Sequence, residues 1–354
     1  MNDVYDIAVI GLGPAGSTFC RLVSDNYTIA AIDPKNDTPD SFMKPCGGLL
    51  SSDAQKAFAC FDMTFPKEII VDPQIFTVKT IDVKTGLIRN YQRFYINFDR
   101  HKFDMWLKSL IPENVDVLNG NCMSIEKECD CYKVSYRDNQ GEIQNIKAKY
   151  LIGADGAKSI VRNTFFPKCK FRKYVAIQQW FEECHPNPFY SCIFDAQTSD
   201  CCSWSVSKDN SFIFGGAFKQ KDCREMFELQ KERLKRYGFK FGTPIKTEAC
   251  LVMRPESISN FCSGKNDIFL LGEAAGLVSP SSLEGISSAI ISAKKLSDVF
   301  NSDTADKNKL YRLKITPQIL KLFFKLFKCQ FMYNPFLRKL VMKSGLKSIK
   351  VIEK

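Results

Sequence analysis

The sequence holds few of the side chains on which most metal sites and hydrolytic triads depend. Its 354 residues include only two histidines, His101 and His185, and its 15 cysteines form no Cys-x-x-Cys pair. Zinc sites, disulfide frameworks and histidine-dependent catalysis are therefore poorly supported, and no metal site is expected. We expect free thiols in a reducing compartment, most of them acting as small apolar groups.

Long uncharged apolar runs are missing as well. No stretch approaches the roughly 18 apolar residues that a membrane span requires. The first six residues hold two acidic groups and no basic one, so they do not resemble a secretory signal. Hydrophobic residues make up 45% of the chain and charged residues 25%, as in ordinary globular proteins. We expect a cytoplasmic protein of about two domains.

Acidic residues are scarce at the C-terminal end, where the positive charge is concentrated. Residues 307–354 carry thirteen Lys/Arg and one acid, a net +12, which leaves the rest of the chain at −1. A helix is expected over 315–327, with lysines at i, i+4 and i+7 beside a broadly apolar surface.

This basic tail has two interpretations. A basic amphipathic helix suits peripheral contact with an anionic membrane, here its inner face. The alternative is a helical pair packed on the protein, with its lysines simply solvated. Nucleic acid is not expected as a partner, because no readout module accompanies the charge.

A glycine-rich turn lies between a strand and a helix at the start of the chain. Residues 5–10 are rich in strand formers, a helix is expected from Ser17, and a second buried strand ends at Asp33. In this βαβ context the glycine spacing is typical of a dinucleotide-binding turn, with Asp33 placed to accept hydrogen bonds from a ribose. The turn alone does not distinguish NAD from FAD. Its candidate cofactor residues are Gly11, Gly13, Ala15 and Gly16.

Two later segments each follow a predicted strand. One reads Gly-Ala-Asp-Gly-x-x-Ser-x-Val-Arg over 153–162, and the other Gly-Glu-Ala-Ala-Gly over 272–276. With the first turn, they resemble the flavoproteins of para-hydroxybenzoate-hydroxylase type. The resemblance implies that FAD is bound, with its ADP half on the first turn and its ribityl chain and diphosphate at the third segment. It assigns Asp155, Glu273, Gly285 and Ile286 to the cofactor, although that family usually has Asp where Glu273 stands.

A narrower resemblance rests on Lys-Pro-Cys-Gly-Gly-Leu at 44–49 and Asp-Arg-x-x-Phe-Asp at 99–104. Both segments are similar to the geranylgeranyl reductase family. The resemblance implies that Cys46, Gly47 and Gly48 lie near the flavin and that Arg100 binds the cofactor. Cys46 is our candidate catalytic residue, as an electron relay or a proton donor. The alternative is a loop cysteine whose neighbouring glycines alone matter, because they let the backbone pass close to a flat ring.

The expected fold class is α/β, with a Rossmann-like FAD-binding domain interrupted by a substrate domain. Aromatic-rich strands joined by polar turns predict that the substrate domain is a mostly antiparallel β-sheet. A basic helical segment is expected to end the chain. The expected boundaries are 1–73, 97–170 and 262–300 for the discontinuous FAD-binding domain, 74–96 and 171–261 for the substrate domain, and 301–354 for the basic segment.

The expected function is an FAD-dependent oxidoreductase that reduces a carbon–carbon double bond by hydride transfer from reduced flavin. The substrate is expected to be a small apolar or lipid-like molecule, such as an isoprenoid, contacted by Trp204 and Tyr190. Trp204 is the single match here to the Tyr-x-Trp-x-Phe-Pro run of many prenyl reductases, and it could equally be an ordinary core aromatic.

Other functions remain open from the sequence. One is an FAD-dependent monooxygenase acting on an aromatic or apolar small molecule, and another is a non-catalytic flavin-binding protein. There is no second dinucleotide fingerprint. Electrons are therefore expected from transiently bound NAD(P)H or from a redox protein.

Overall fold

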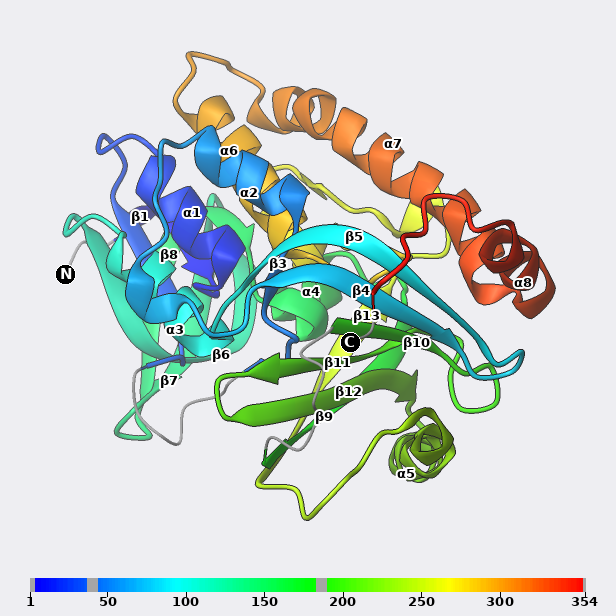
Figure 1. Cartoon of the computed structure of the whole chain (residues 1–354). Coiled ribbons are helices and arrows are strands. Elements are labelled where there is room, and N and C mark those ends of the chain that lie inside the picture. Colours follow the sequence, from blue (N-terminus) through cyan, green and yellow to red (C-terminus); the bar gives the residue numbers. More distant parts are fainter. Residues whose placement is uncertain (1–3, 37–43, 183–189, 353–354) are drawn as a thin grey trace.

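Two β-sheets form the framework of the protein. The structure is a computed structural model, and it describes residues 4–36, 44–182 and 190–352. Figure 1 places the N-terminal sheet at the left, the second sheet at the lower centre and a long helix, α7, along the top. The expected α/β fold class is confirmed. The charged residues Glu353 and Lys354 of the expected basic tail lie outside the described residues.

The first sheet is parallel at its centre. Strand β1 (Tyr5–Ile10) lies between β2 (Ile29–Asp33) and β8 (Ile143–Gly153), with β15 (Ile268–Leu270) beyond β8. Buried apolar residues fill these short strands, as is usual for a parallel sheet covered on both faces. The remaining strands are β6 (Val115–Glu128), β7 (Cys131–Asp138) and β14 (Gly264–Lys265), of which β7 bridges the extensions of β6 and β8.

The carboxyl ends of three parallel strands meet at one level. Ile10 at the end of β1 is in register with Gly153 at the end of β8, and Gly153 with Leu270 at the end of β15. Each strand then runs into a turn that contains glycine. In open α/β sheets ligands bind outside the carboxyl ends of the strands, so this edge is where a cofactor is expected.

Helices α1 (Pro14–Leu22) and α6 (Ile286–Phe300) pack against each other beside this sheet. Helix α1 begins at Pro14, three residues earlier than expected, because proline is well suited to the first position of a helix. Helix α2 (Ser52–Ala59) was not expected from the sequence; the Ser51 hydroxyl caps it by accepting the Ala54 N–H at 3.4 Å. Two further helices are α3 (Arg100–Ser109) and α4 (Ile160–Phe165).

The second sheet is antiparallel except for the parallel pair β10–β4. Helix α5 (Cys223–Leu234) packs on it through an aromatic core in which Phe227 stacks on Phe214 with ring centres 5.2 Å apart. Its strands, in sheet order, are β13 (Lys246–Arg254), β9 (Arg172–Glu182), β12 (Ser211–Lys219), β11 (Ser203–Lys208), β10 (Tyr190–Phe194), β4 (Ile75–Asp82), β5 (Leu87–Asn97) and β3 (Leu49–Leu50).

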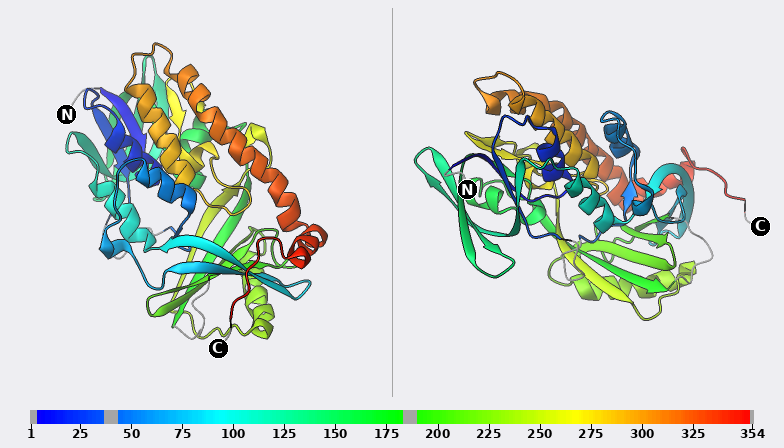
Figure 2. Two further views of the ribbon diagram at one scale, coloured as in Figure 1. Left: turned by 45° about the horizontal axis from the view of Figure 1, so that its top comes forward. Right: turned by 90° about the vertical axis from the view of Figure 1, so that its left-hand side faces the viewer.

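The chain ends in helices α7 (Lys307–Tyr333) and α8 (Pro335–Ser344), seen along the edge of the molecule in Figure 2. Helix α7 extends further at both ends than the expected 315–327 and continues through Pro317. Helix α7 is anchored on the first sheet, because the Tyr311 hydroxyl donates a hydrogen bond to the Leu270 carbonyl of β15 at 3.1 Å. Among the described residues, no helix has both the length and the low charge needed to cross a membrane.

Short 3₁₀ segments complete the secondary structure. They occupy Lys67–Ile69, Gly156–Lys158, Lys235–Tyr237, Ile258–Asn260 and Gly272–Ala275. The segments Gly156–Lys158 and Gly272–Ala275 follow the ends of β8 and β15, and they therefore form part of the ligand edge of the first sheet.

Candidate active site

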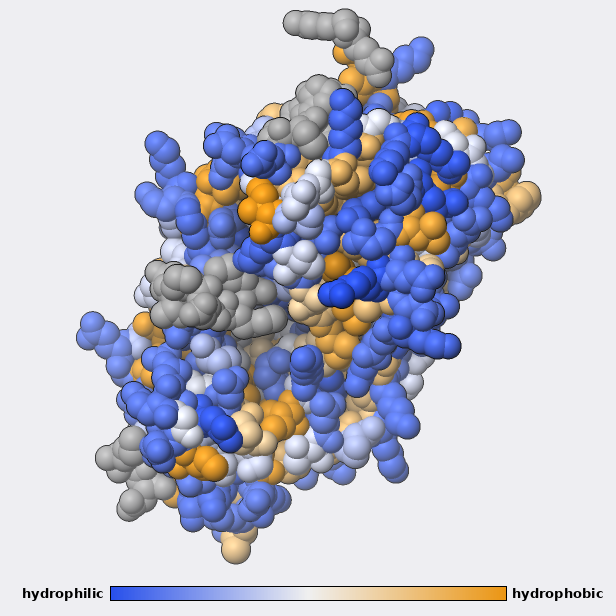
Figure 3. Space-filling model, turned by 90° about the horizontal axis from the view of Figure 1, so that it is seen from below, coloured by the Kyte–Doolittle hydropathy of each residue, from blue (hydrophilic) through white to orange (hydrophobic). Residues whose placement is uncertain are grey.

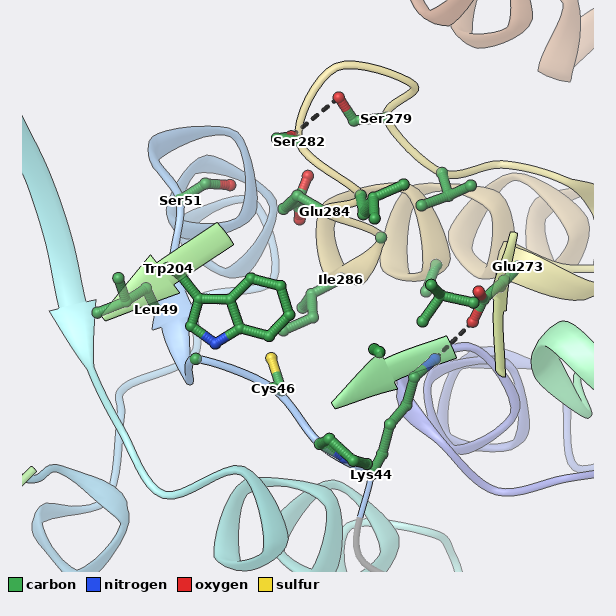
Figure 4. Close-up of a pocket in the computed structure, with 18 of the residues that line it drawn as sticks. Lys44, Cys46, Leu49, Ser51, Trp204, Glu273, Ser279, Ser282, Glu284 and Ile286 are labelled. Carbon is green, nitrogen blue, oxygen red and sulfur yellow. Dashed lines mark hydrogen bonds and ion pairs between the residues drawn. The ribbon is translucent and has the colours of Figure 1, made fainter. Parts of the chain in front are cut away.

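A cavity of about 1290 Å³ extends from the ligand edge of the first sheet across the second sheet to α7 and α8. Figure 4 shows its central part, where the Trp204 indole and the Cys46 side chain lie near each other. Fourteen of the fifteen site residues expected from the sequence line this cavity. They are Gly11, Gly13, Ala15, Asp33, Cys46, Gly47, Gly48, Arg100, Asp155, Tyr190, Trp204, Glu273, Gly285 and Ile286.

Gly16 is the exception, and its role is in packing. A Cβ atom on Gly16 would lie 1.9 Å from the Gly11 carbonyl oxygen, so only glycine lets α1 approach the turn. A Cβ on Gly13 would meet no protein atom within 4 Å and would project into open space. The turn thus offers bare backbone at Gly13 where a pyrophosphate is expected, with the first N–H groups of α1 behind it.

Asp33 is held in place by backbone donors. One carboxylate oxygen accepts the Leu12 N–H at 2.6 Å and the other accepts the Lys35 N–H at 2.9 Å, while the Lys108 ammonium lies 3.8 Å away. Because each carboxylate oxygen has two acceptor positions, both can still accept a hydroxyl from the cavity. The geometry therefore leaves Asp33 available to a ribose.

Asp155 carries an acceptor that lacks a protein partner. Its Oδ2 accepts the Ile160 N–H at 2.6 Å, whereas its buried Oδ1 has no hydrogen-bond partner among the described residues. Burial is the largest influence on this carboxyl group and raises its pKa. A buried unsatisfied oxygen is unfavourable by about 1–3 kcal/mol, and a ligand hydroxyl entering the cavity would remove that cost.

Glu273 is bonded within the protein. Its carboxylate forms an ion pair with the Lys44 ammonium (Figure 4) and accepts the Met253 N–H at 3.3 Å. Burial disfavours the charged form of Lys44, but the nearby Glu273 carboxylate outweighs burial and raises the Lys44 pKa. Lys44 was not expected to be a site residue, because nothing in the sequence indicates that it pairs with Glu273, 229 positions away.

Arg100 opens α3 and is fixed next to Cys46. Its Nε donates to the Asp104 carboxylate at 2.8 Å, and its guanidinium also hydrogen-bonds the Cys46 thiol. Burial alone would raise the pKa of Asp104, but the cations Arg100 and Lys35 lower it to about 2. The buried carboxylate is thus ionised at neutral pH and holds Arg100 on the cavity wall.

Cys46 belongs to a tight glycine loop that faces Trp204. Its sulfur accepts the Gly48 N–H at 3.4 Å, and Gly48 has a φ of +59° that favours glycine. A Cβ on Gly47 would touch the Trp204 ring at 3.4 Å. A Cβ on Gly215 would come within 2.7 Å of the same ring. Trp204 is therefore a fixed cavity wall, not an ordinary core aromatic.

A pair of thiols further along the cavity was missed from the sequence. Cys192 of β10 and Cys202, just before β11, both line the cavity, and their side chains hydrogen-bond each other. The bond from Cys192 is the main cause that lowers the Cys202 pKa, to about 7. The alternation of Tyr190, Cys192 and Phe194 on one strand face is the signal that could have placed Cys192 beside Tyr190.

The residues at the ligand edge fit FAD. Gly13 leaves room for a pyrophosphate, and Asp155 has an unmet acceptor for a hydroxyl. Helix α6 begins at Ile286 with Gly285 as its N-cap, and both residues line the cavity. The Glu284 carboxylate accepts the Ser287 N–H at 2.9 Å and so caps the first turn of the helix. These features define a flavoprotein that binds FAD.

Comparison with known proteins identifies the family. Residues 117–305 match the FAD binding domain family. The chain is also 48% identical to Protein CbrA of Escherichia coli O6:H1 over 347 residues, covering 98% of this chain and 94% of that protein. The chain therefore belongs to the FAD binding domain family and to the family of CbrA. FAD as cofactor is confirmed, and so is the broad class of FAD-dependent oxidoreductase.

Two solved structures share the fold. A geranylgeranyl bacteriochlorophyll reductase-like protein from Thermoplasma acidophilum has a TM-score of 0.79 at 20% identity, covering 96% of this chain and 91% of that one. PqsL, a probable FAD-dependent monooxygenase from Pseudomonas aeruginosa, has a TM-score of 0.68 at 12% identity, covering 97% and 99%. Both a reductase-like protein and a monooxygenase are thus built on this fold.

Proposed function

We propose that this protein is a reductase of the geranylgeranyl reductase type, which saturates a carbon–carbon double bond in an isoprenoid or other lipid-like substrate. One observation carries the proposal. The cavity does not end at the cofactor edge but continues past Trp204 along the second sheet to α7 and α8. Its length and its single continuous course suit a long flexible substrate better than a compact ring.

The lining of the far part of the cavity supports an amphiphilic substrate. Apolar and aromatic side chains line its walls, including Val78, Tyr95 and Phe194. Tyr95 and Tyr190 meet edge to face with ring centres 5.7 Å apart and form an aromatic part of this wall. Cations gather where α7, α8 and β5 border the cavity, namely Arg93, Lys325, Lys328 and Lys347. A substrate with an apolar chain and an anionic head group matches this distribution.

Reduction of a double bond requires one hydride and one proton, delivered to its two carbons. Bound FAD in its reduced form supplies the hydride. The proton comes from the Cys46 thiol, which lines the cavity beside Trp204 and Arg100. Trp204 holds the substrate against this thiol, because its indole is fixed by contact with Gly47 and Gly215 and by a 3.1 Å hydrogen bond from its Nε1 to Gln178. Solvent then restores the proton on sulfur.

The replacement Cys46→Ser tests this assignment. A serine hydroxyl is a far weaker acid, so turnover with a prenyl lipid should fall by about 100-fold or more, while the FAD content stays unchanged. The matched control is Cys60→Ser, at an exposed cysteine after α2, which should keep full turnover. Stopped-flow reoxidation of the anaerobically reduced protein measures the step directly. Equal reoxidation rates in the wild type and in Cys46→Ser would show that the Cys46 thiol does not donate the proton.

The second candidate function is a monooxygenase, favoured by the shared fold with PqsL over nearly the whole of both chains. The reductase and monooxygenase functions are distinguished by exposing the reduced protein to oxygen with and without substrate. A reductase consumes substrate without oxygen, whereas a monooxygenase needs oxygen and inserts one of its atoms. Reoxidation that no member of a panel of prenyl lipids, quinones and aromatics accelerates would favour a non-catalytic flavin-binding protein.

The electron donor is proposed to be transiently bound NAD(P)H or a redox protein. The described residues offer a single glycine-rich dinucleotide turn, and the geometry above commits it to FAD. Anaerobic bleaching of the yellow protein by NADH, NADPH or a reduced ferredoxin identifies the donor class.

A further inference from the structure

Helix α7 carries an apolar stripe on the side that faces away from the protein. Exposed side chains recur along it at spacings of three, four and seven residues, which places them on one helix face. The buried side chains of the same helix, such as Tyr311, Ile315 and Leu322, lie on the opposite face. The stripe consists of Leu313, Leu320, Phe324, Phe327 and Phe331, and on α8 it continues with Phe336, Leu340 and Val341.

The exposure of this stripe is unusual for aromatic side chains. Phe324 is 63% exposed, Phe327 61% and Phe336 68%. Singly exposed apolar residues are common on proteins, but a contiguous set marks a surface for interaction. The face seen from below in Figure 3 differs, because hydrophilic side chains dominate it and apolar ones appear only in patches.

Positive charge surrounds the stripe. Residues 307–352 contain twelve Lys/Arg and no Asp or Glu. Two of the cations are engaged within the protein: Lys321 pairs with Asp53 of α2 at 2.9 Å, and Arg338 pairs with buried Asp82 at 3.0 Å. Exposed lysines on these helices include Lys314, Lys339 and Lys343, and Lys347 and Lys350 follow α8.

We propose that this surface, the α7–α8 face, docks on an anionic membrane. A helix that presents phenylalanines to the outside with lysines beside them lies in the bilayer interface, its rings among the acyl chains and its ammonium groups near lipid phosphates. Each basic residue near an anionic leaflet adds about 1 kcal/mol of attraction. A nucleic acid would use the lysines but would leave the row of aliphatic and aromatic side chains exposed to water.

The cavity opens onto the same face. Phe331, Val341 and Leu346 are all exposed, and all three also line the cavity. Docking would therefore bring the mouth of the cavity to the lipid surface, with Lys325 and Lys328 at its edge. That consequence rests on the proposed function, since it gives a lipid substrate a route that avoids water. The docking itself depends only on the surface.

Vesicle flotation tests the docking. We expect the full-length FAD-loaded protein to float with vesicles of phosphatidylcholine and phosphatidylglycerol, and to stay behind with phosphatidylcholine alone. Phe324→Ser with Phe327→Ser should weaken binding to the anionic vesicles by about tenfold or more. Lys339→Glu with Lys343→Glu should weaken it by a similar factor and reduce its salt dependence. None of these four residues lines the cavity.

Matched variants on other surfaces act as controls. Ile143→Ser with Ile245→Ser removes two exposed apolar groups, and Lys219→Glu with Lys221→Glu makes the same change in net charge. Both should bind vesicles as the wild type does. The docking is wrong if the wild type fails to float, if the α7–α8 variants float equally well, or if the controls lose as much. Tighter binding to a short DNA duplex than to the vesicles would also overturn it. Turnover with a detergent-dispersed lipid tests the proposed function separately, because it needs no membrane.

Discussion

The two ends of the cavity are built by different means. At the cofactor end, backbone groups after β1, β8 and β15 form the wall, and the strands bring them together through their parallel register. At the substrate end, side chains on β4, β5, β10 and β11 form the wall, and α7 and α8 close it. A backbone wall depends on glycine and on chain geometry, whereas a side-chain wall depends on which residue occupies each strand face.

Because the two walls are built differently, the two ends should tolerate different substitutions. Backbone in a parallel register cannot move at one turn without disturbing the sheet behind it, so changes at the cofactor end should affect folding and FAD together. Changes at the substrate end should alter substrate binding while FAD stays bound.

The largest effect is expected for Gly16→Ala. The new Cβ would fall 1.9 Å from the Gly11 carbonyl oxygen, a backbone atom that cannot swing away, and 3.3 Å from the Ala154 Cβ. We expect a loss of more than about 3 kcal/mol in the free energy of unfolding, together with loss of the yellow colour. Denaturant unfolding and the flavin absorbance of the purified protein measure the two effects.

Gly13→Ala is the matched control for that variant. Its Cβ meets no protein atom within 4 Å, so the stability of the FAD-free protein should change by less than about 1 kcal/mol. FAD affinity should nevertheless fall, because the methyl group occupies the space expected for the pyrophosphate. If Gly13→Ala binds FAD as tightly as the wild type, the pyrophosphate does not lie at this turn.

An intermediate effect is expected for Gly215→Ala at the substrate end. Its Cβ would come within 2.7 Å of the Trp204 ring and would push the indole into the cavity. The KM for a prenyl lipid should rise by about tenfold, while FAD content stays that of the wild type. Gly242→Ala, whose Cβ meets nothing within 4 Å, should leave both unchanged. Loss of FAD from Gly215→Ala would show that the two ends are not independent.

A pH-dependent effect concerns Lys208, which lies between the two ends. Its ammonium donates to the Asn97 side chain at 2.7 Å and to the Phe98 and Gly48 carbonyls at 2.6 and 3.2 Å, the last within the Cys46 loop. Burial lowers its pKa to about 8, from an ordinary value of 10.5. Between these pH values the unfolded chain binds more protons than the folded one, so stability rises with pH.

Lys208→Met tests this coupling. Relative to that variant, the wild type should gain up to roughly 3 kcal/mol of stability as the pH rises from about 8 to about 10.5. The control is Lys219→Met, at an exposed lysine that ends β12. Urea unfolding at several pH values measures the difference, and a wild-type curve parallel to that of Lys208→Met would contradict it.

The sequence was most informative where local chemistry decides local structure. The strand and glycine turn around Gly11, the acid ending β2 and the start of α3 at Arg100 could all be predicted, because each depends on neighbours in the chain. Gly16 was expected to allow close packing of the helix and was also grouped with the cofactor residues; the structure places it against the Gly11 carbonyl oxygen and outside the cavity lining. Helix α2 was missed because its eight residues give a short and weak periodic signal.

The sequence alone predicted that three glycine-bearing turns follow three strands, because each turn is a contiguous motif. The FAD-binding class followed from the resemblance of these motifs to known flavoproteins. Only the tertiary structure decided what lies opposite those turns. The Lys44–Glu273 ion pair and the cavity mouth at Phe331 join residues that are distant in the chain. Such contacts depend on how the sheets and helices pack, and no local pattern encodes that packing.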